Sequence, residues 1–206
     1  MPYLPAVGNH DLGWNATDDP ARATDRLALP PGPAGRPLGN YWYAVDVAGV
    51  HLVFLDSNAY EVLDQEAWLE RDLAAARKAK TRAIFVFTHD GPYSRGLHRG
   101  NALARARYVP ILVKWKVDML FSGHDHMYQR GEVGGLRYMV SGGGGAPLYA
   151  QTCGVSGKKA CVEDGSVVVL KEHHYATVVV EKGGAIEVCP RKPDGTRLEK
   201  CVRWKP

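Results

Sequence analysis

Three apolar runs of this chain each end in polar residues of the kinds that bind metal ions. The runs end in GNHD at residues 8–11, in THDGPYS at residues 88–94 and in GHDHMYQR at residues 123–130. Buried strands of an open α/β sheet lead into loops at one edge of the sheet, and ligands collect at that edge. The three segments therefore predict an α/β fold with a functional site at the strand ends.

The hydrophobic pattern predicts parallel strands in the middle of the chain and antiparallel strands toward its end. The first part is expected to contain a strand at 3–8, an irregular loop at 12–39 with one helical turn near 22–27, and a hairpin at 41–58 that turns at Ala48-Gly49. The middle is expected to contain a helix at 65–80 capped by Asp64, a buried strand at 83–87, a helix at 101–116 that restarts at Pro110, and a buried strand at 118–122. Beyond residue 131 we expect a hairpin with a Gly-Gly turn, an exposed loop at 153–166, a second hairpin in HYATVVVEKGGAIEV, and a last strand after Asp194-Gly195.

Composition fits one globular domain, which we place at residues 1–206. The chain is 45% hydrophobic and 23% charged, which is enough apolar content for one substantial core. Its net charge of +4 suits anionic ligands such as phosphates, but the Lys and Arg residues are scattered and indicate no nucleic-acid partner. No apolar run is long enough to predict a membrane span. Met1 leads directly into PYLPAVGNHD, so we expect no signal peptide in this chain.

All four cysteines lie in the last quarter of the chain, at positions 153, 161, 189 and 201. Two local disulfides, Cys153–Cys161 and Cys189–Cys201, are the simplest pairing, and free core thiols are the alternative. Disulfides would imply a protein outside the cytoplasm whose export signal lies outside this chain.

The strand-end residues form a candidate metal site. Asn9 offers an amide oxygen, and His89, His124 and His126 offer imidazole nitrogens, which are the commonest metal ligands near neutral pH. A spacing of two in extended backbone puts His124 and His126 on one side and Asp125 on the other. A single histidine is more often structural, but three such clusters together favour a metal site.

Three further residues are candidates for gripping phosphate oxygens. Arg95, His98 and Arg99 follow HDGPYS and are expected to line the mouth of the site. The alternative is that they form a solvated loop face. His51 lies inside a hairpin strand and is expected to be structural.

GNHD, HDGPYS and GHDHMYQR, in that order, resemble the calcineurin-like metallophosphoesterases. The resemblance is closest to the purple acid phosphatase branch, which SGGGGAPLY at 141–149 and the HYATVVV hairpin also resemble. It implies a two-sheet β-sandwich flanked by helices in four αββα layers. It also implies two transition-metal ions (Fe, Zn or Mn) and hydrolysis of phosphomonoesters, with a phosphorylated small molecule as the partner.

The resemblance also implies a role for each strand-end residue. Asn9, His89 and His124 would bind the second metal, and His126 would bind the first. His10 would stabilise the transition state or protonate the leaving oxygen, and Asp11 would orient His10.

The resembled family has two more motifs ahead of GNHD, Asp-x-His or Asp-x-Gly and Gly-Asp-x-x-Asp or Gly-Asp-x-x-Tyr, which supply the bridging Asp and most ligands of the first metal. Only seven residues precede GNHD here, so the first β-α-β portion is expected to be missing and the chain to hold one ion or none. Three explanations remain open: a truncated product or start-codon error, a shortened protein that recruits ligands from another chain in an oligomer, and a non-catalytic module that binds phosphate or a partner.

Overall fold

The computed structural model describes residues 3–11, 41–156 and 158–206. The described part has two α-helices, α2 (Leu63–Lys78) and α3 (Val109–Lys114). A 3-10 turn, Ser57–Ala59, precedes α2, and a short π-helical segment, Ala104–Tyr108, leads into α3. The strands are β1 (Tyr43–Val47), β2 (Val50–Phe54), β3 (Ala83–Thr88), β4 (Met119–Ser122), β5 (Tyr128–Val133), β6 (Leu136–Ser141), β7 (Ser166–Leu170), β8 (Tyr175–Val180), β9 (Ile186–Arg191) and β10 (Val202–Trp204).

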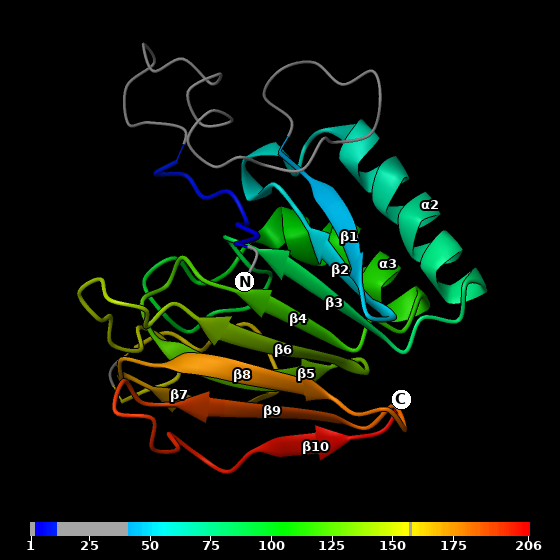
Figure 1. Ribbon diagram of the computed structural model, residues 1–206. Helices are drawn as coiled ribbons and strands as arrows, with labels where there is room; N and C mark the ends of the chain where they lie inside the picture. Colours follow the sequence, from blue (N-terminus) through cyan, green and yellow to red (C-terminus); the bar gives the residue numbers. More distant parts are fainter. Residues whose placement is uncertain (1–2, 12–40, 157) are drawn as a thin grey trace.

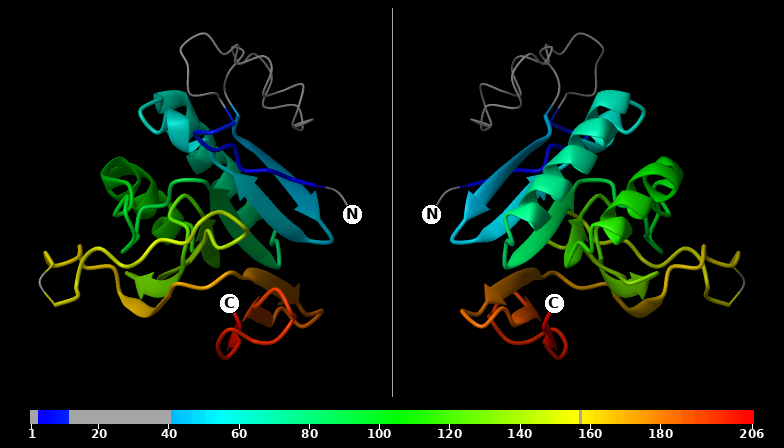
Figure 2. Two further views of the ribbon diagram at one scale, coloured as in Figure 1. Left: turned by 90° about the vertical axis from the view of Figure 1, so that its left-hand side faces the viewer. Right: turned by 90° about the vertical axis from the view of Figure 1, so that its right-hand side faces the viewer.

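The strands form two sheets, as expected for an α/β protein of the metallophosphoesterase type. The larger sheet has the order β1-β2-β3-β4-β6-β5-β7, and β2, β3, β4 and β6 run parallel. The smaller sheet, β10-β9-β8, is antiparallel. Helices α2 and α3 lie on one face of the larger sheet and the smaller sheet lies on the other (Figure 1; Figure 2).

Side chains of the central strands point alternately to the two faces of the larger sheet, which explains this layering. Ile84 and Val86 of β3 pack toward Leu69 and Leu73 of α2, whereas Phe85 belongs to the core that contains Ile186 and Val188 of β9. Since successive side chains of a strand point to opposite faces, a continuous apolar run buries both faces of its sheet.

Most predicted elements are confirmed, and three predictions are wrong. The hairpin turn at Ala48-Gly49 is confirmed, with φ of 50° and 80°, as the tight turn requires. Residues 3–8 form no strand, because Pro5 has no N–H to donate and its carbonyl instead accepts from the Tyr43 hydroxyl at 2.7 Å. Asp64 is not the N-cap, because α2 begins one residue earlier, after Val62. The sequence prediction also omits β7, although its Val167–Leu170 run is typical of a strand. The predicted loop at 12–39 lies outside the described residues.

Strand β8 has one edge without a partner strand in the part of the chain that the structure describes. Ala176 lies opposite Pro190, which has no N–H and whose carbonyl accepts from Leu198 on the β10 side at 2.9 Å. Facing residue pairs of two antiparallel strands alternate between hydrogen-bonded and non-hydrogen-bonded pairs. Ala176 belongs to a non-hydrogen-bonded pair, so the backbone N–H and C=O groups of Ala176, Val178 and Val180 point away from β9. They form the free edge of the smaller sheet.

Both predicted disulfides, Cys153–Cys161 and Cys189–Cys201, are present. None of the described helices has the length and apolar character to cross a membrane.

His51 is structural, as predicted, and its contacts with two carboxylates make the free energy of unfolding depend on pH. Its ring nitrogens lie 2.9 Å from Asp46 and 2.8 Å from Asp72. Burial lowers the pKa of His51, but the hydrogen bonds and charges of the two carboxylates outweigh burial and raise the pKa above its ordinary value. A raised pKa in the folded state adds stability below about pH 6.5, which is lost as pH rises through the folded pKa.

We therefore expect His51→Gln to lower the free energy of unfolding by about 1–2 kcal/mol at acidic pH and by less above neutrality. Urea unfolding at two pH values measures the difference. An effect that grows with rising pH would contradict the assignment.

Candidate metal centre

The register of the larger sheet brings His89 and His124 to one place. Thr88, the last residue of β3, pairs with Ser122, the last residue of the parallel strand β4. The residues that follow therefore emerge at the same edge, where the Gly123 N–H donates to the His89 carbonyl at 2.9 Å. His124 has φ of 63°, a left-handed conformation uncommon outside glycine and often found at functional sites.

Asn9, His89 and His124 converge on a common point. The Nε2 atom of His89 lies 2.8 Å from Oδ1 of Asn9 and 3.0 Å from Nδ1 of His124. Two donor atoms bound at about 2.1 Å and at right angles around one cation would lie about 3.0 Å apart. Both distances to His89 Nε2 match the spacing of neighbouring ligands around one ion.

The one ring position of His89 Nε2 cannot make two full hydrogen bonds, to Asn9 Oδ1 and to His124 Nδ1. If His89 Nε2 carries a proton, it can donate to Asn9 Oδ1, but it then has no lone pair for His124. If Nε2 is unprotonated, its lone pair faces the amide oxygen. A cation shared by the three atoms removes the conflict, so the donor set fits a metal ion.

The protonation state also suits a metal. Burial lowers the pKa of His89 to about 4, and the charge of His124 acts in the same direction. Burial lowers the pKa of His124 as well. Both imidazoles are therefore neutral near pH 7, and the neutral form is the one that binds metals.

Gly8 lets the N-terminal segment approach His89. A Cβ atom at residue 8 would lie 2.8 Å from Nδ1 of His89, closer than non-bonded contacts allow. The glycine therefore places Asn9 beside the imidazole.

His126 lies at the same edge but is turned toward a different partner. Its Nδ1 lies 2.9 Å from the Pro147 carbonyl oxygen, and its ring stacks on Tyr149 with centroids 4.3 Å apart. Tyr149 also lies 6.0 Å from the ring of His98, which contacts the ring of His124 at 3.8 Å. Tyr149 thus bridges His126 and His98, and the sequence analysis did not single it out, although it closes the SGGGGAPLY segment.

Asp125 points away from the imidazoles, as predicted, and holds the loop that carries His98. It is buried, it accepts the His98 N–H at 3.0 Å, and it also accepts from the Ser94 hydroxyl. Gly96 leaves room for the carboxylate, because a Cβ there would lie 2.4 Å from its carbon. The buried carboxylate therefore sets the position of His98 over His124.

His10 and Asp11 lie in the exposed turn at the start of the site. Asp11 accepts the Gly8 N–H at 2.8 Å and so closes the turn that carries His10. The charges of both residues act on the pKa of His89, which places them in its electrostatic neighbourhood.

The three candidate phosphate-binding residues have different surroundings. Arg95 donates two hydrogen bonds of 2.8 Å to the carboxylate of Asp164, which is 3% exposed. That carboxylate also accepts from Gln129 at 3.1 Å, so Arg95 belongs to a buried network beneath the loop. His98 and Arg99 are exposed, and only His98 stacks on a candidate ligand.

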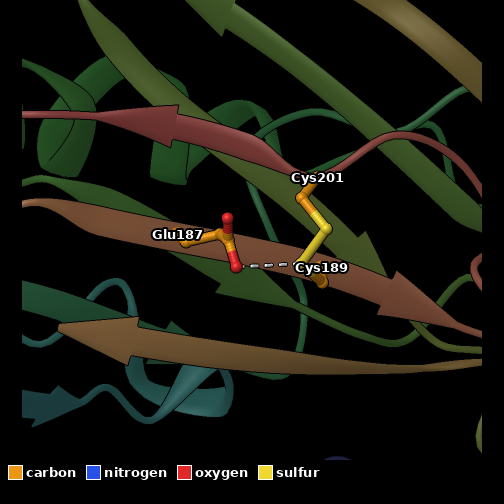
Figure 3. Close-up of side chains that lie close together, drawn as sticks. All are labelled: Glu187, Cys189 and Cys201. Carbon is orange, nitrogen blue, oxygen red and sulfur yellow. Dashed lines mark hydrogen bonds between the residues drawn. A yellow bond between two sulfur atoms is a disulfide. The ribbon is translucent and has the colours of Figure 1, made fainter. Parts of the chain in front are cut away.

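No carboxylate within the described ranges joins the imidazoles. The one group of three His, Cys, Asp or Glu residues whose ligand atoms all lie within 4.8 Å there is Glu187, Cys189 and Cys201. Figure 3 shows that these two sulfurs are joined in a disulfide, so this group is no metal site. The described donor set at the strand ends is therefore neutral.

These features define a class of protein, since residues 1–128 match the family of calcineurin-like phosphoesterases. The chain belongs to this family.

Within it, several similar proteins are purple acid phosphatases. One from Glycine max is 32% identical over 72% of this chain and 34% of its own length. The Fe(3+)-Zn(2+) purple acid phosphatase 12 of Arabidopsis thaliana is 27% identical over 69% of this chain and 32% of its own. The structure of a purple acid phosphatase from yellow lupin (Lupinus luteus) seeds matches with a TM-score of 0.78 and 19% identity, covering 98% of this chain and 40% of that one. The chain thus spans about a third of the length of the curated relatives it matches.

The close packing of Gly8 on His89 gives a test of the donor arrangement. We expect Gly8→Ala to push the ring out of line and weaken metal binding by about tenfold, as a disturbed second shell does. Calorimetric titration with Zn²⁺ measures this change. Gly183→Ala is the matched control, because a Cβ at residue 183 meets nothing within 4 Å. Equal affinities of the two variants would show that Gly8 does not set the site.

Proposed function

We propose that this chain carries one metal-binding side of a phosphomonoesterase active site, with Asn9, His89 and His124 as the ligands. The observation that supports it is the meeting of three electron-pair donors around His89 Nε2, at 2.8 and 3.0 Å. The family membership agrees with phosphoester chemistry.

The chemistry of the donor atoms limits which metal ions would suit the site. Imidazole nitrogens and an amide oxygen suit iron, zinc or manganese. A cation held there would neutralise charge on a phosphate group and make water more acidic.

The remaining residues have roles around the bound phosphate. His10, exposed in the turn that Asp11 closes, donates a proton to the leaving oxygen. His98 and Arg99 face solvent beyond His124 and can contact phosphate oxygens. Arg95 is left out of the site, because Asp164 holds its guanidinium.

His126 is the ligand proposed for a second ion. The described residues add no carboxylate to it. A second ion therefore needs acidic ligands from another chain or from further sequence. The neutral donor set also favours a second candidate function, a one-ion module that binds phosphate without hydrolysing it.

We place the protein outside the cytoplasm, because two disulfides persist only in an oxidising compartment. The substrate is a phosphorylated small molecule.

Metal analysis combined with hydrolysis of p-nitrophenyl phosphate separates the candidates. Two bound ions with turnover support the phosphatase in this chain alone. One ion with phosphate binding and no turnover supports the binding module. Absence of any bound iron, zinc or manganese after titration would refute the proposed metal centre.

A further inference from the structure

A cavity lies at the opposite end of the larger sheet from the candidate metal centre. Asp118 precedes β4 and lines this cavity, whereas His124 follows β4. The cavity has a volume of about 540 Å³, within the range of small-molecule sites. The end of α2, the end of α3, the β5–β6 turn and the end of β10 enclose it.

The lining of this cavity is strongly basic. Four cationic side chains line it against one side-chain carboxylate: Arg77, Lys116, Arg137 and Lys205 against Asp118. The carboxylate is already engaged, since it is 5% exposed and accepts the Ile84 N–H at 2.8 Å. Asp118 also pairs with Arg77 at 3.5 Å and offsets one of the four charges, so the lining side chains keep an excess of positive charge.

Two of the cations are held in place. Arg77 donates through Nε to the Trp115 carbonyl at 2.8 Å and through Nη2 to the Lys116 carbonyl, which fixes its guanidinium at the end of α3. Arg137 lies over the ring of Trp204, 5.0 Å from its centroid. Arg137 also pairs with Glu132, but the two atoms are 3.4 Å apart and both side chains are partly exposed, so this ion pair is weak.

Lys116 and Trp204 add donors. Lys116 has φ of 51°, at the position after a helix where glycine is usual, and it is one of the residues that line the cavity. Trp204 lines the cavity too, and its indole N–H is buried with no partner among the described residues. A buried donor without an acceptor is costly unless a ligand or water satisfies it.

We propose that this cavity binds a small organic anion, with a phosphate, phosphonate or carboxylate head and an apolar body. The head pairs with Arg137 and Lys116, because guanidinium and ammonium groups make strong hydrogen bonds to such oxygens. The body packs on Trp204 and Val117. The site is separate from the metal centre and does not depend on its activity.

Phenylphosphonate is a suitable probe, because its P–C bond is not a phosphoester and resists hydrolysis. In ¹⁵N-labelled protein, titration is expected to shift the indole N–H resonance of Trp204, identified by its loss in Trp204→Phe. We expect Arg137→Gln and Lys116→Gln each to weaken binding about tenfold, the effect of losing one charge-assisted hydrogen bond.

Two controls make the result decisive. Lys114→Gln removes a cation at the end of α3, two positions before Lys116, that does not line the cavity, and it is expected to leave binding unchanged. His124→Ala is likewise expected to leave the Trp204 shift unchanged.

Should the Trp204 resonance stay unshifted up to about 10 mM phenylphosphonate, a very weak limit for any ligand, the proposal is wrong. Loss of the shift in His124→Ala would place the anion at the metal centre instead. Lys116 is exposed, so its variant keeps the test valid if Arg137→Gln is unstable.

Discussion

Replacing His89 by alanine is expected to weaken metal binding by at least about 100-fold. His89 Nε2 is the atom that both Asn9 and His124 approach, so its removal takes away the donor that the other two share. Loss of an outer-shell partner already costs 10- to 100-fold in metal affinity, and loss of a direct ligand costs more. Titration with Zn²⁺ or Mn²⁺, followed by calorimetry, measures the effect.

The matched control for this prediction is His173→Ala. His173 is an exposed imidazole whose Nδ1 lies 3.2 Å from the Gly143 carbonyl oxygen. It is expected to bind metal as the unaltered protein does. If His89→Ala keeps full affinity while near-UV circular dichroism shows an intact fold, the three-ligand assignment fails.

The second large effect is expected from Asp164→Ala, which acts on stability. This carboxylate accepts two hydrogen bonds from Arg95, one from Gln129 and one from the Ser166 N–H at 3.0 Å. Without it, a partly buried guanidinium and a buried amide lose their partner. Breaking a buried ion pair from one side costs about 3 kcal/mol, which urea unfolding measures as a lower midpoint at unchanged slope.

Glu163→Ala is the control for Asp164→Ala, since the neighbouring carboxylate is exposed. It is expected to change the free energy of unfolding by less than about 0.5 kcal/mol. Similar losses in both variants would mean that the 153–166 segment is sensitive to any substitution rather than to this network.

Sequence reasoning reached the parts of the site that local patterns determine. Apolar runs of four to six residues locate β3 and β4. Parallel pairing of neighbouring strands then places the residues that follow them, His89 and His124, at one edge. The spacing of two in GHDH assumes extended backbone, whereas His124 has φ of 63°. Asp125 is nonetheless buried, where it accepts from Ser94 and from the His98 N–H.

Other features depend on contacts between residues far apart in the chain. Arg95 stands beside His98 in sequence, but its charge is satisfied by Asp164, 69 positions later. Tyr149 reaches His126 and His98 only because the segment after β6 folds back over the loop. Nothing in the local pattern of either residue predicts these pairings.

The free edge of β8 has a consequence for how this protein behaves at high concentration. None of the six residues of β8 carries a charge, three of them (Ala176, Val178 and Val180) present unpaired backbone groups on that side, and Val178 is 38% exposed. An edge of this kind is a template on which another extended segment can form a further strand. Val178 and Ala176 also line a cavity of about 360 Å³ that reaches His89. A strand added there would lie close to His89, so self-association or completion by a second polypeptide would change the surroundings of the candidate metal centre.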